Sequence, residues 1–228
     1  MPEMSAAAEP PRDSVWIDLT TLNRAACNAV QERYGLPPEV MTYFLLRYQS
    51  AKLIHAGPAL FLVTFLAVPS VRHLFTTREL KICVTPTLVA TLYRVPGKSH
   101  STLAQMLPLL SGLDKESVGR FLGGLLEGVI GSYEVIVKAV ENGMRREEQQ
   151  WGRRVEKFIQ FLREERVFLS NVTRNGSKLF TAEESDFLRR LEERVGVLAR
   201  VTWDATRPKK DERVTLASVL SEKGDGDA

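Results

Sequence analysis

The residue types that most often carry catalysis or bind metals are few and scattered in this sequence. There are three histidines, His55, His73 and His100, and two cysteines, Cys27 and Cys83. No C-x-x-C, H-E-x-x-H or G-x-S-x-G spacing occurs, so no motif brings metal ligands or an activated nucleophile together. The many carboxylates stand beside Arg or Lys on expected helix faces, which is typical of a solvated, ion-paired surface. The sequence therefore predicts no catalytic residue, no metal site, no cofactor and no enzymatic activity.

Two segments resemble phosphate-binding loops in part. Residues 96–99 contain the Gly-Lys-Ser that ends such a loop, but Leu92 stands where the motif has its first glycine. The glycine-rich stretch 119–131 lies inside an apolar helical repeat and lacks the G-K-[ST] signature. We therefore expect no nucleotide site in either segment.

The glycines of that stretch predict close helix packing instead. Each glycine inside a helix costs about 1 kcal/mol relative to alanine, so a helix with several of them needs compensation. The simplest compensation is another helix packed very closely against the small-residue face. The glycines assigned to this contact are Gly119, Gly123, Gly124 and Gly128.

Composition limits the class of protein without identifying a partner. The 228 residues are 44% hydrophobic and 26% charged, which is ordinary for a folded protein. The net charge of +3 is too small to indicate a nucleic-acid or membrane partner by itself. The longest apolar stretch has 13 residues, against the roughly 20 that a membrane-spanning helix needs. With no secretory signal at the start and distant cysteines, we expect a reducing compartment and free thiols.

Apolar spacing predicts helices along most of the chain. The stretch 56–68 reads as a buried core helix, and 85–95 as helix or strand, with its helical neighbours favouring helix. Trp151, Val155, Phe158 and Leu162 form one helical stripe, and residues 181–184 form a capping box that opens a further helix. Asn-Gly at 175–176 indicates a β-hairpin.

These elements predict an all-α fold. A packed helical bundle in an N-terminal domain is expected to precede a smaller helical C-terminal domain with a short β-hairpin. We assign residues 1–13 to a disordered N-terminus, 14–140 to the N-terminal domain, 141–204 to the C-terminal helical region and 205–228 to a disordered polar tail.

The apolar stretch and the residues after it resemble a segment of the orthomyxovirus matrix proteins, the influenza-like matrix family. The matching residues are Gly57, Thr64, Val68, Pro69, Ser70, Arg72 and Leu74. In that family a Gly-led apolar helix ends in Val-Pro-Ser-x-Arg-x-Leu. The Cys/His cluster and the compact basic signal of the influenza A type are missing here, so a divergent, thogotovirus-like genus fits better.

The resemblance implies a viral matrix protein that forms a self-associating layer under the envelope. Its implied partners are further copies of itself, the anionic lipid membrane surface, viral ribonucleoprotein or RNA, and envelope glycoprotein tails. Its implied locations are the virion beneath the envelope, the host cytoplasm, the inner face of the host plasma membrane and the nucleus.

Two sets of basic residues are candidates for membrane and ribonucleoprotein contacts, because each cation near an anionic membrane contributes about 1 kcal/mol. The first patch consists of Arg72, Arg78, Lys81 and Lys98. The second basic face consists of Arg145, Arg146, Arg153, Arg154 and Lys157.

The alternative function is a winged-helix-like nucleic-acid-binding regulator. Helices at 145–166 and 181–200 flank the expected hairpin, which would place Arg174 and Lys178 near phosphates. The order of elements counts against it, because a winged helix has its recognition helix before the hairpin, and here the capped helix follows.

Overall fold

The computed structural model describes residues 16–19, 24–46, 50–70, 72–93, 117–143, 150–176 and 179–206. In chain order the elements are β1 (Trp16–Asp18), α1 (Arg24–Tyr34), α2 (Pro38–Leu45), β2 (Lys52–Ala56), β3 (Ala59–Pro69), β4 (Phe75–Val84), β5 (Val89–Tyr93), α4 (Val118–Glu141), α5 (Trp151–Asn175) and α6 (Ala182–Thr206).

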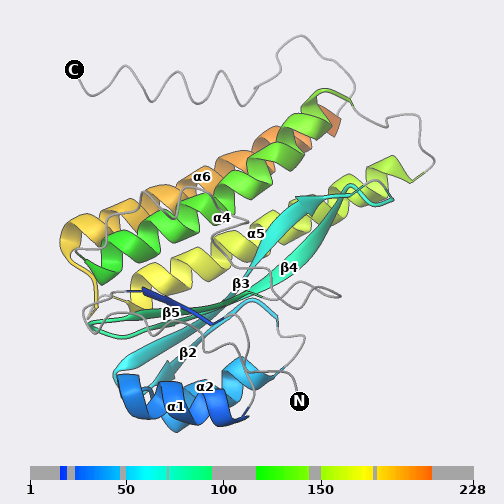
Figure 1. Cartoon of the computed structure of the whole chain (residues 1–228). Helices are drawn as coiled ribbons and strands as arrows, with labels where there is room; N and C mark the ends of the chain where they lie inside the picture. The colour runs from blue at the N-terminus through cyan, green and yellow to red at the C-terminus, as the bar shows by residue number, and fades with distance from the viewer. Residues whose placement is uncertain are drawn as a thin grey trace, which may run out of the picture.

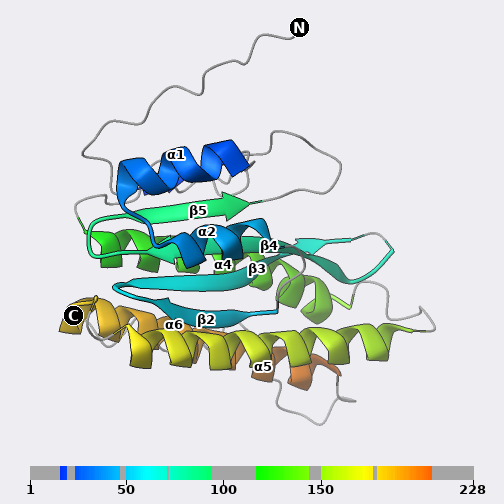
Figure 2. The ribbon, with the colours of Figure 1, turned by 90° about the horizontal axis from the view of Figure 1, so that it is seen from below.

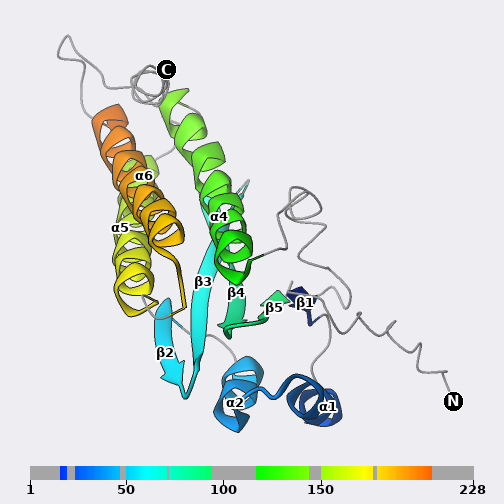
Figure 3. The same cartoon turned by 90° about the vertical axis from the view of Figure 1, so that its left-hand side faces the viewer.

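The strands form a five-stranded mixed sheet in the order β1-β5-β4-β3-β2. Strands β2 to β5 are an antiparallel meander, and β1 pairs parallel to β5 at the far edge. Helices α1 and α2 cover one face of the sheet, and the long helices α4, α5 and α6 lie on the other (Figures 1 and 3). The described chain therefore has a layer of helices on each side of the sheet.

Each face of the sheet has its own hydrophobic core, and β3 contributes to both. Leu60, Leu62 and Leu66 belong to the core beneath α4, α5 and α6, whereas Phe61 and Val63 belong to the core beneath α1 and α2. A strand that is buried on both faces needs apolar side chains at successive positions. This requirement explains the long apolar run.

The predicted all-α fold is wrong, and its main error lies in this run. Residues 59–69 are a strand rather than a core helix, and residues 89–93 form β5 rather than a helix. A continuous apolar segment has no periodicity that separates a buried helix from a strand buried on both faces. The β-branched and aromatic residues of the run favour the strand.

The Val-Pro-Ser motif ends a strand instead of a helix. Val68 pairs with Thr76 of β4, and Pro69 is the last residue of β3. In the turn that follows, the Ser70 amide donates to the Leu74 carbonyl at 3.4 Å, and the Ser70 hydroxyl accepts from the His73 amide at 3.2 Å. This is a β3–β4 hairpin.

The hairpin predicted at 175–176 is also wrong. Asn175 is the last residue of α5, and Gly176 follows it as the C-cap, its amide donating to the Val172 carbonyl at 2.8 Å. The Gly176 φ of −82° is not the left-handed conformation that a two-residue hairpin turn requires. A glycine after a helix commonly marks its C-terminus, and Asn-Gly here has that role.

Two local predictions in the second half are confirmed. The stripe residues Val155, Phe158 and Leu162 are buried in α5. The capping box is present, because the Glu184 amide donates to Thr181 Oγ1 at 3.2 Å and the Thr181 amide donates to Glu184 Oε2 at 2.8 Å. The domain boundary near residue 140 stays a prediction. The predicted tail at 205–228 begins too early, because α6 runs to Thr206; its remaining residues and the predicted tail at 1–13 lie outside the described residues.

Candidate functional site

A buried carboxyl, Glu165, lies where α4 and α5 pack on the sheet. Glu165 is only 2% exposed. Thr64 of β3 donates a hydrogen bond of 2.8 Å from Oγ1 to Glu165 Oε2. Tyr133 of α4 donates from its hydroxyl to the Phe65 carbonyl at 2.7 Å. Three elements therefore bring hydroxyl and carboxyl groups to one point inside the core.

The helical period of α5 places Glu165 there. It stands three residues after Leu162 and four before Leu169, both of which are buried, so it occupies a position on the apolar stripe. Thr64 alternates with Leu62 and Leu66, so its hydroxyl points to the same side of the sheet. A carboxylate on an apolar stripe was the sequence signal for this cluster, and the prediction that carboxylates occupy solvated helix faces missed it.

Aromatic rings line the same region of the core. Phe75 of β4 packs edge-on against Phe158 at 4.9 Å between ring centroids, and Phe161 packs edge-on against Tyr133 at 5.2 Å. Edge-to-face pairs at these separations stabilise a core beyond their buried area. These rings exclude water from the space between β4, α4 and α5.

Burial raises the pKa of Glu165 to about 7, and the neighbouring Glu164 carboxylate acts in the same direction. The hydroxyls of Thr64 and Tyr133 oppose this shift. Within the described part of the chain, Glu165 Oε1 has no hydrogen-bond partner. Burial also raises the pKa of the Tyr133 hydroxyl well above its usual value. Within the cluster, Glu165 is thus the group whose pKa lies near neutral pH, and it is enclosed in the core.

On the other face of the sheet, Lys81 closes the C-terminal end of α2. Its Nζ donates to the Phe44 carbonyl at 3.1 Å, to the Tyr43 carbonyl at 3.3 Å and to the Leu46 carbonyl. It also forms an ion pair with Glu79 at 3.5 Å. The last carbonyls of a helix have no partner within the helix and carry a partial negative charge, so a lysine is favourable there.

The prediction that Lys81 belongs to an exposed basic patch is therefore wrong. Lys81 is 1% exposed, because the register of β4 pairs it with Val63 and Leu92 and turns it toward α2. Arg72 is exposed in the β3–β4 turn and Arg78 is half-buried in β4. Lys98 lies outside the described residues. Of the three described members of the predicted patch, Lys81 is buried and does not share an exposed surface with the other two.

The second basic face is described only in part. Arg153 and Lys157 are exposed and Arg154 is half-buried, all in the first turns of α5. Arg145 and Arg146 lie outside the described residues.

Glycines of α4 lie against α6. A Cβ added at Gly123 would come within 2.7 Å of Phe187 Cδ1, and one added at Gly119 would overlap the Glu184 carboxyl. Gly124 and Gly128 are also buried in α4. The close approach of the two helices therefore requires that positions 119 and 123 have no side chain.

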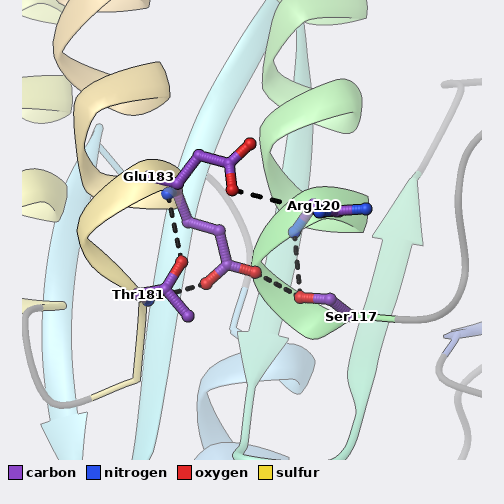
Figure 4. A network of polar contacts seen from close by, with 5 residues as sticks. Ser117, Arg120, Thr181 and Glu183 are labelled. Atoms are coloured by element: carbon purple, nitrogen blue, oxygen red, sulfur yellow. Dashed lines mark hydrogen bonds and ion pairs between the residues drawn. The ribbon is translucent and has the colours of Figure 1, made fainter.

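The N-terminal ends of α4 and α6 share one polar network (Figure 4). Ser117, the N-cap of α4, donates to Glu184 Oε1, and its hydroxyl accepts from the Arg120 amide at 3.4 Å. Thr181 caps α6 through the reciprocal bonds with Glu184 described above. Burial would raise the pKa of Glu184, but the hydrogen bonds from Ser117 and Thr181 outweigh it, so the pKa is lowered. One carboxylate thus serves two helix N-termini.

The described surface has a shallow groove of about 570 Å³ between β2 and α5. A second hollow of about 440 Å³ continues along α5, since Arg163, Val167 and Asn171 line both. Elsewhere, Cys83 is buried, and burial raises the pKa of its thiol to about 12. No group of three or more His, Cys, Asp or Glu that could hold a metal occurs among the described residues.

No protein-family model and no curated protein sequence matches this chain. Solved structures do share its fold. The soluble domain of CorA from Methanocaldococcus jannaschii matches with a TM-score of 0.60 and 17% identity over 82% of this chain and 81% of that one. The complete CorA magnesium transporter of the same organism matches with a TM-score of 0.61 and 16% identity, over 89% of this chain and 68% of that one. Full-length CmaX matches with a TM-score of 0.59 and 14% identity, over 96% and 69%.

These comparisons and the sheet overturn the viral matrix prediction. The fold is that of CorA soluble domains and CmaX, and the segment that carries the matrix resemblance is a strand and a turn. The predicted lipid, ribonucleoprotein, RNA and envelope-tail partners, and the virion, host plasma membrane and nuclear locations, are wrong with it. The winged-helix alternative is wrong as well, because α5 runs through the expected wing. Self-association is a prediction that these findings leave open.

Proposed function

We propose that this chain is the soluble domain of a magnesium transport system of the CorA type. The observation that carries the proposal is the likeness to the CorA soluble domain over about four-fifths of both chains.

The contacts among the helices and between α5 and the sheet support a structural role for this domain. The Ser117–Glu184–Thr181 network joins α4 to α6, and the hydrogen bond between Thr64 and Glu165 joins α5 to the sheet. The three described groups with strongly shifted pKa values, Glu165, Tyr133 and Cys83, are enclosed in the core. We therefore propose a non-catalytic role.

Magnesium enters this proposal as cargo of the transport system, and no residue of this chain is named as its ligand. Of the helices that the structure describes, none combines the length and the apolar character needed to cross a membrane. Membrane passage is thus not assigned to any described element. The proposed role of the described part is to form a soluble domain of the system.

The test is deletion of the coding sequence in the organism that encodes the chain, followed by measurement of cellular magnesium across limiting and excess external Mg²⁺. We expect magnesium content or the magnesium requirement for growth to change, while cellular zinc stays constant. Rescue by the wild type and by Gly131→Ala, where a Cβ meets open space, should succeed. Rescue by Gly123→Trp, which would force α4 from α6, should fail. Unchanged magnesium content and growth in the deletion strain would contradict the proposal.

A further inference from the structure

The groove between β2 and α5 has a strand on one side and a helix on the other. Strand β2 is at the edge of the sheet, pairs with β3, and has no second partner among the described strands. Figure 2 shows α5 running alongside it. Residues 50–53 line the strand side, and residues between Gln160 and Asn171 line the helix side. An edge strand offers backbone donors and acceptors that an extended peptide can use.

The groove and its continuation are positively charged. Four cations line them, namely Lys52, Arg163, Arg166 and Arg174, against two carboxylates, Glu164 and Glu192. Glu192 already pairs with Arg166 at 3.8 Å, and Glu164 accepts a hydrogen bond from Gln160 at 3.0 Å. Arg163 and Arg174 have no carboxylate partner in the described part of the chain. Two guanidinium groups are therefore available to an anionic ligand.

An apolar side chain lies between these two arginines. Val167 is 61% exposed, one helical turn after Arg163 and near the middle of the joined hollows. A single exposed valine is ordinary on a protein surface. Its place between unpaired arginines, in a hollow that also contains the amide of Asn171, is the arrangement found at peptide-binding sites, where an apolar anchor lies among polar contacts.

We propose that this groove binds an extended acidic segment of a partner protein, a role beyond the proposed transport function. An apolar side chain of the segment rests on Val167, and its carboxylates pair with Arg163 and Arg174. These two residues are 11 positions apart on α5, which is about 16 Å at the helical rise. An extended peptide covers that distance in about five residues. The expected ligand therefore has carboxylates about five positions apart with an apolar residue between them.

The charge distribution favours such a peptide over a polyanion. Glu164 lies inside the groove and would repel a continuous row of phosphates, whereas a peptide can place a neutral residue opposite it. Guanidinium groups also pair with carboxylates in a bidentate geometry that selects for position as well as charge.

The test is selection from a phage-displayed library of random peptides on the full-length chain, followed by anisotropy titration of the selected peptides. We expect enrichment of peptides with two acidic positions about five apart around an apolar residue. The double variant Arg163→Glu/Arg174→Glu should weaken their binding more than tenfold, and Val167→Asp should do the same. The matched control Arg153→Glu/Arg200→Glu changes the same net charge at exposed arginines outside the groove and should bind normally.

Thermal melts of all five proteins, the wild type and the conservative variant below included, establish that each is folded. The conservative variant Arg163→Lys/Arg174→Lys should retain part of the binding, since it keeps the charge and loses the bidentate geometry. Enriched peptides without acidic residues, or equal loss in the control pair, would overturn the proposal. It would also be overturned if phosphatidylserine vesicles or a single-stranded RNA oligonucleotide bound more tightly through the same arginines.

Discussion

Thr64 and Glu165 are 101 positions apart in the chain, and a hydrogen bond of 2.8 Å joins them in the core. The bond links the central part of β3 to the buried face of α5. It gives Glu165 Oε2 a hydrogen-bond donor, whereas Glu165 Oε1 has no hydrogen-bond partner among the described residues. We therefore expect the stability of the contact between α5 and the sheet to depend on the charge of Glu165.

The first prediction concerns pH. In the unfolded chain the Glu165 carboxyl titrates near 4.5, and in the folded protein near 7. Between these values the folded state holds a proton that the unfolded state has lost, so stability falls as pH rises from about 4.5 to about 7 and is then constant. The interval corresponds to about 3 kcal/mol of unfolding free energy. Urea unfolding at pH 5 and pH 8 measures this difference in the free energy of unfolding.

Glu165→Gln should remove this pH dependence, because the amide does not ionise. The matched control is Glu164→Gln, the adjacent exposed carboxylate, which should keep nearly all of it. Equal pH dependence in the wild type and Glu165→Gln would show that the carboxyl does not carry the effect.

The second prediction concerns the partner hydroxyl. Thr64→Val preserves shape but removes the donor to Glu165, and an incompletely paired buried carboxylate costs about 1–3 kcal/mol. Because Thr64 lowers the pKa of Glu165, its loss should move the upper end of the pH interval to higher pH. In a double-mutant cycle with Glu165→Gln, the coupling between the two sites should be larger at pH 8 than at pH 5. A coupling that does not change with pH would contradict the assignment.

The third prediction concerns the end of α2. Lys81→Met should leave the carbonyls of Phe44 and Leu46 without their donor and destabilise the protein by about 1–3 kcal/mol. Amide hydrogen exchange should accelerate most in the last turn of α2. The control is Lys138→Met on the exposed surface of α4, which should leave exchange in α2 unchanged. Unaltered exchange at α2 in Lys81→Met would show that the ammonium group is not what holds this helix end.

The fourth prediction compares two glycines of α4. Gly123→Ala brings a methyl group to within 2.7 Å of Phe187 and should destabilise the protein by about 1–3 kcal/mol through overpacking. Gly131→Ala meets open space and should stabilise it by up to about 1 kcal/mol, the difference in helix propensity. Thermal unfolding should show a lower Tm for Gly123→Ala and a higher Tm for Gly131→Ala than for the wild type. Shifts of the same sign would mean that α4 and α6 are not in close contact at position 123.

Features that depend on neighbours in the sequence were predictable, because their chemistry is local. The capping box at Thr181 and Glu184 is an example, since both hydrogen bonds arise within one helical turn. The apolar stripe on α5 is another example. Extending its spacing along the same helix would have identified Glu165 as a carboxyl at a core position.

Features that depend on distant pairing were not predictable. The apolar periodicity of strand β3 does not separate it from a helix, because its two sets of side chains enter two different cores. The burial of Lys81 depends on the register between β3 and β4, and a shift of one residue would turn it to the opposite face. The groove depends on where α5 crosses the edge of the sheet, which no local pattern encodes.

The parallel pairing of β1 with β5 sets an order for folding during synthesis. Trp16 pairs with Val89, and between them lies the whole antiparallel meander. A chain that emerges from the ribosome N-terminus first must therefore expose β1 unpaired until more than seventy further residues have been made. Closing so long a loop is slow, and the meander of β2 to β5, built from neighbouring hairpins, can assemble before it. Among the described strands β1 comes first in the chain, and we expect it to join the sheet after the meander has formed.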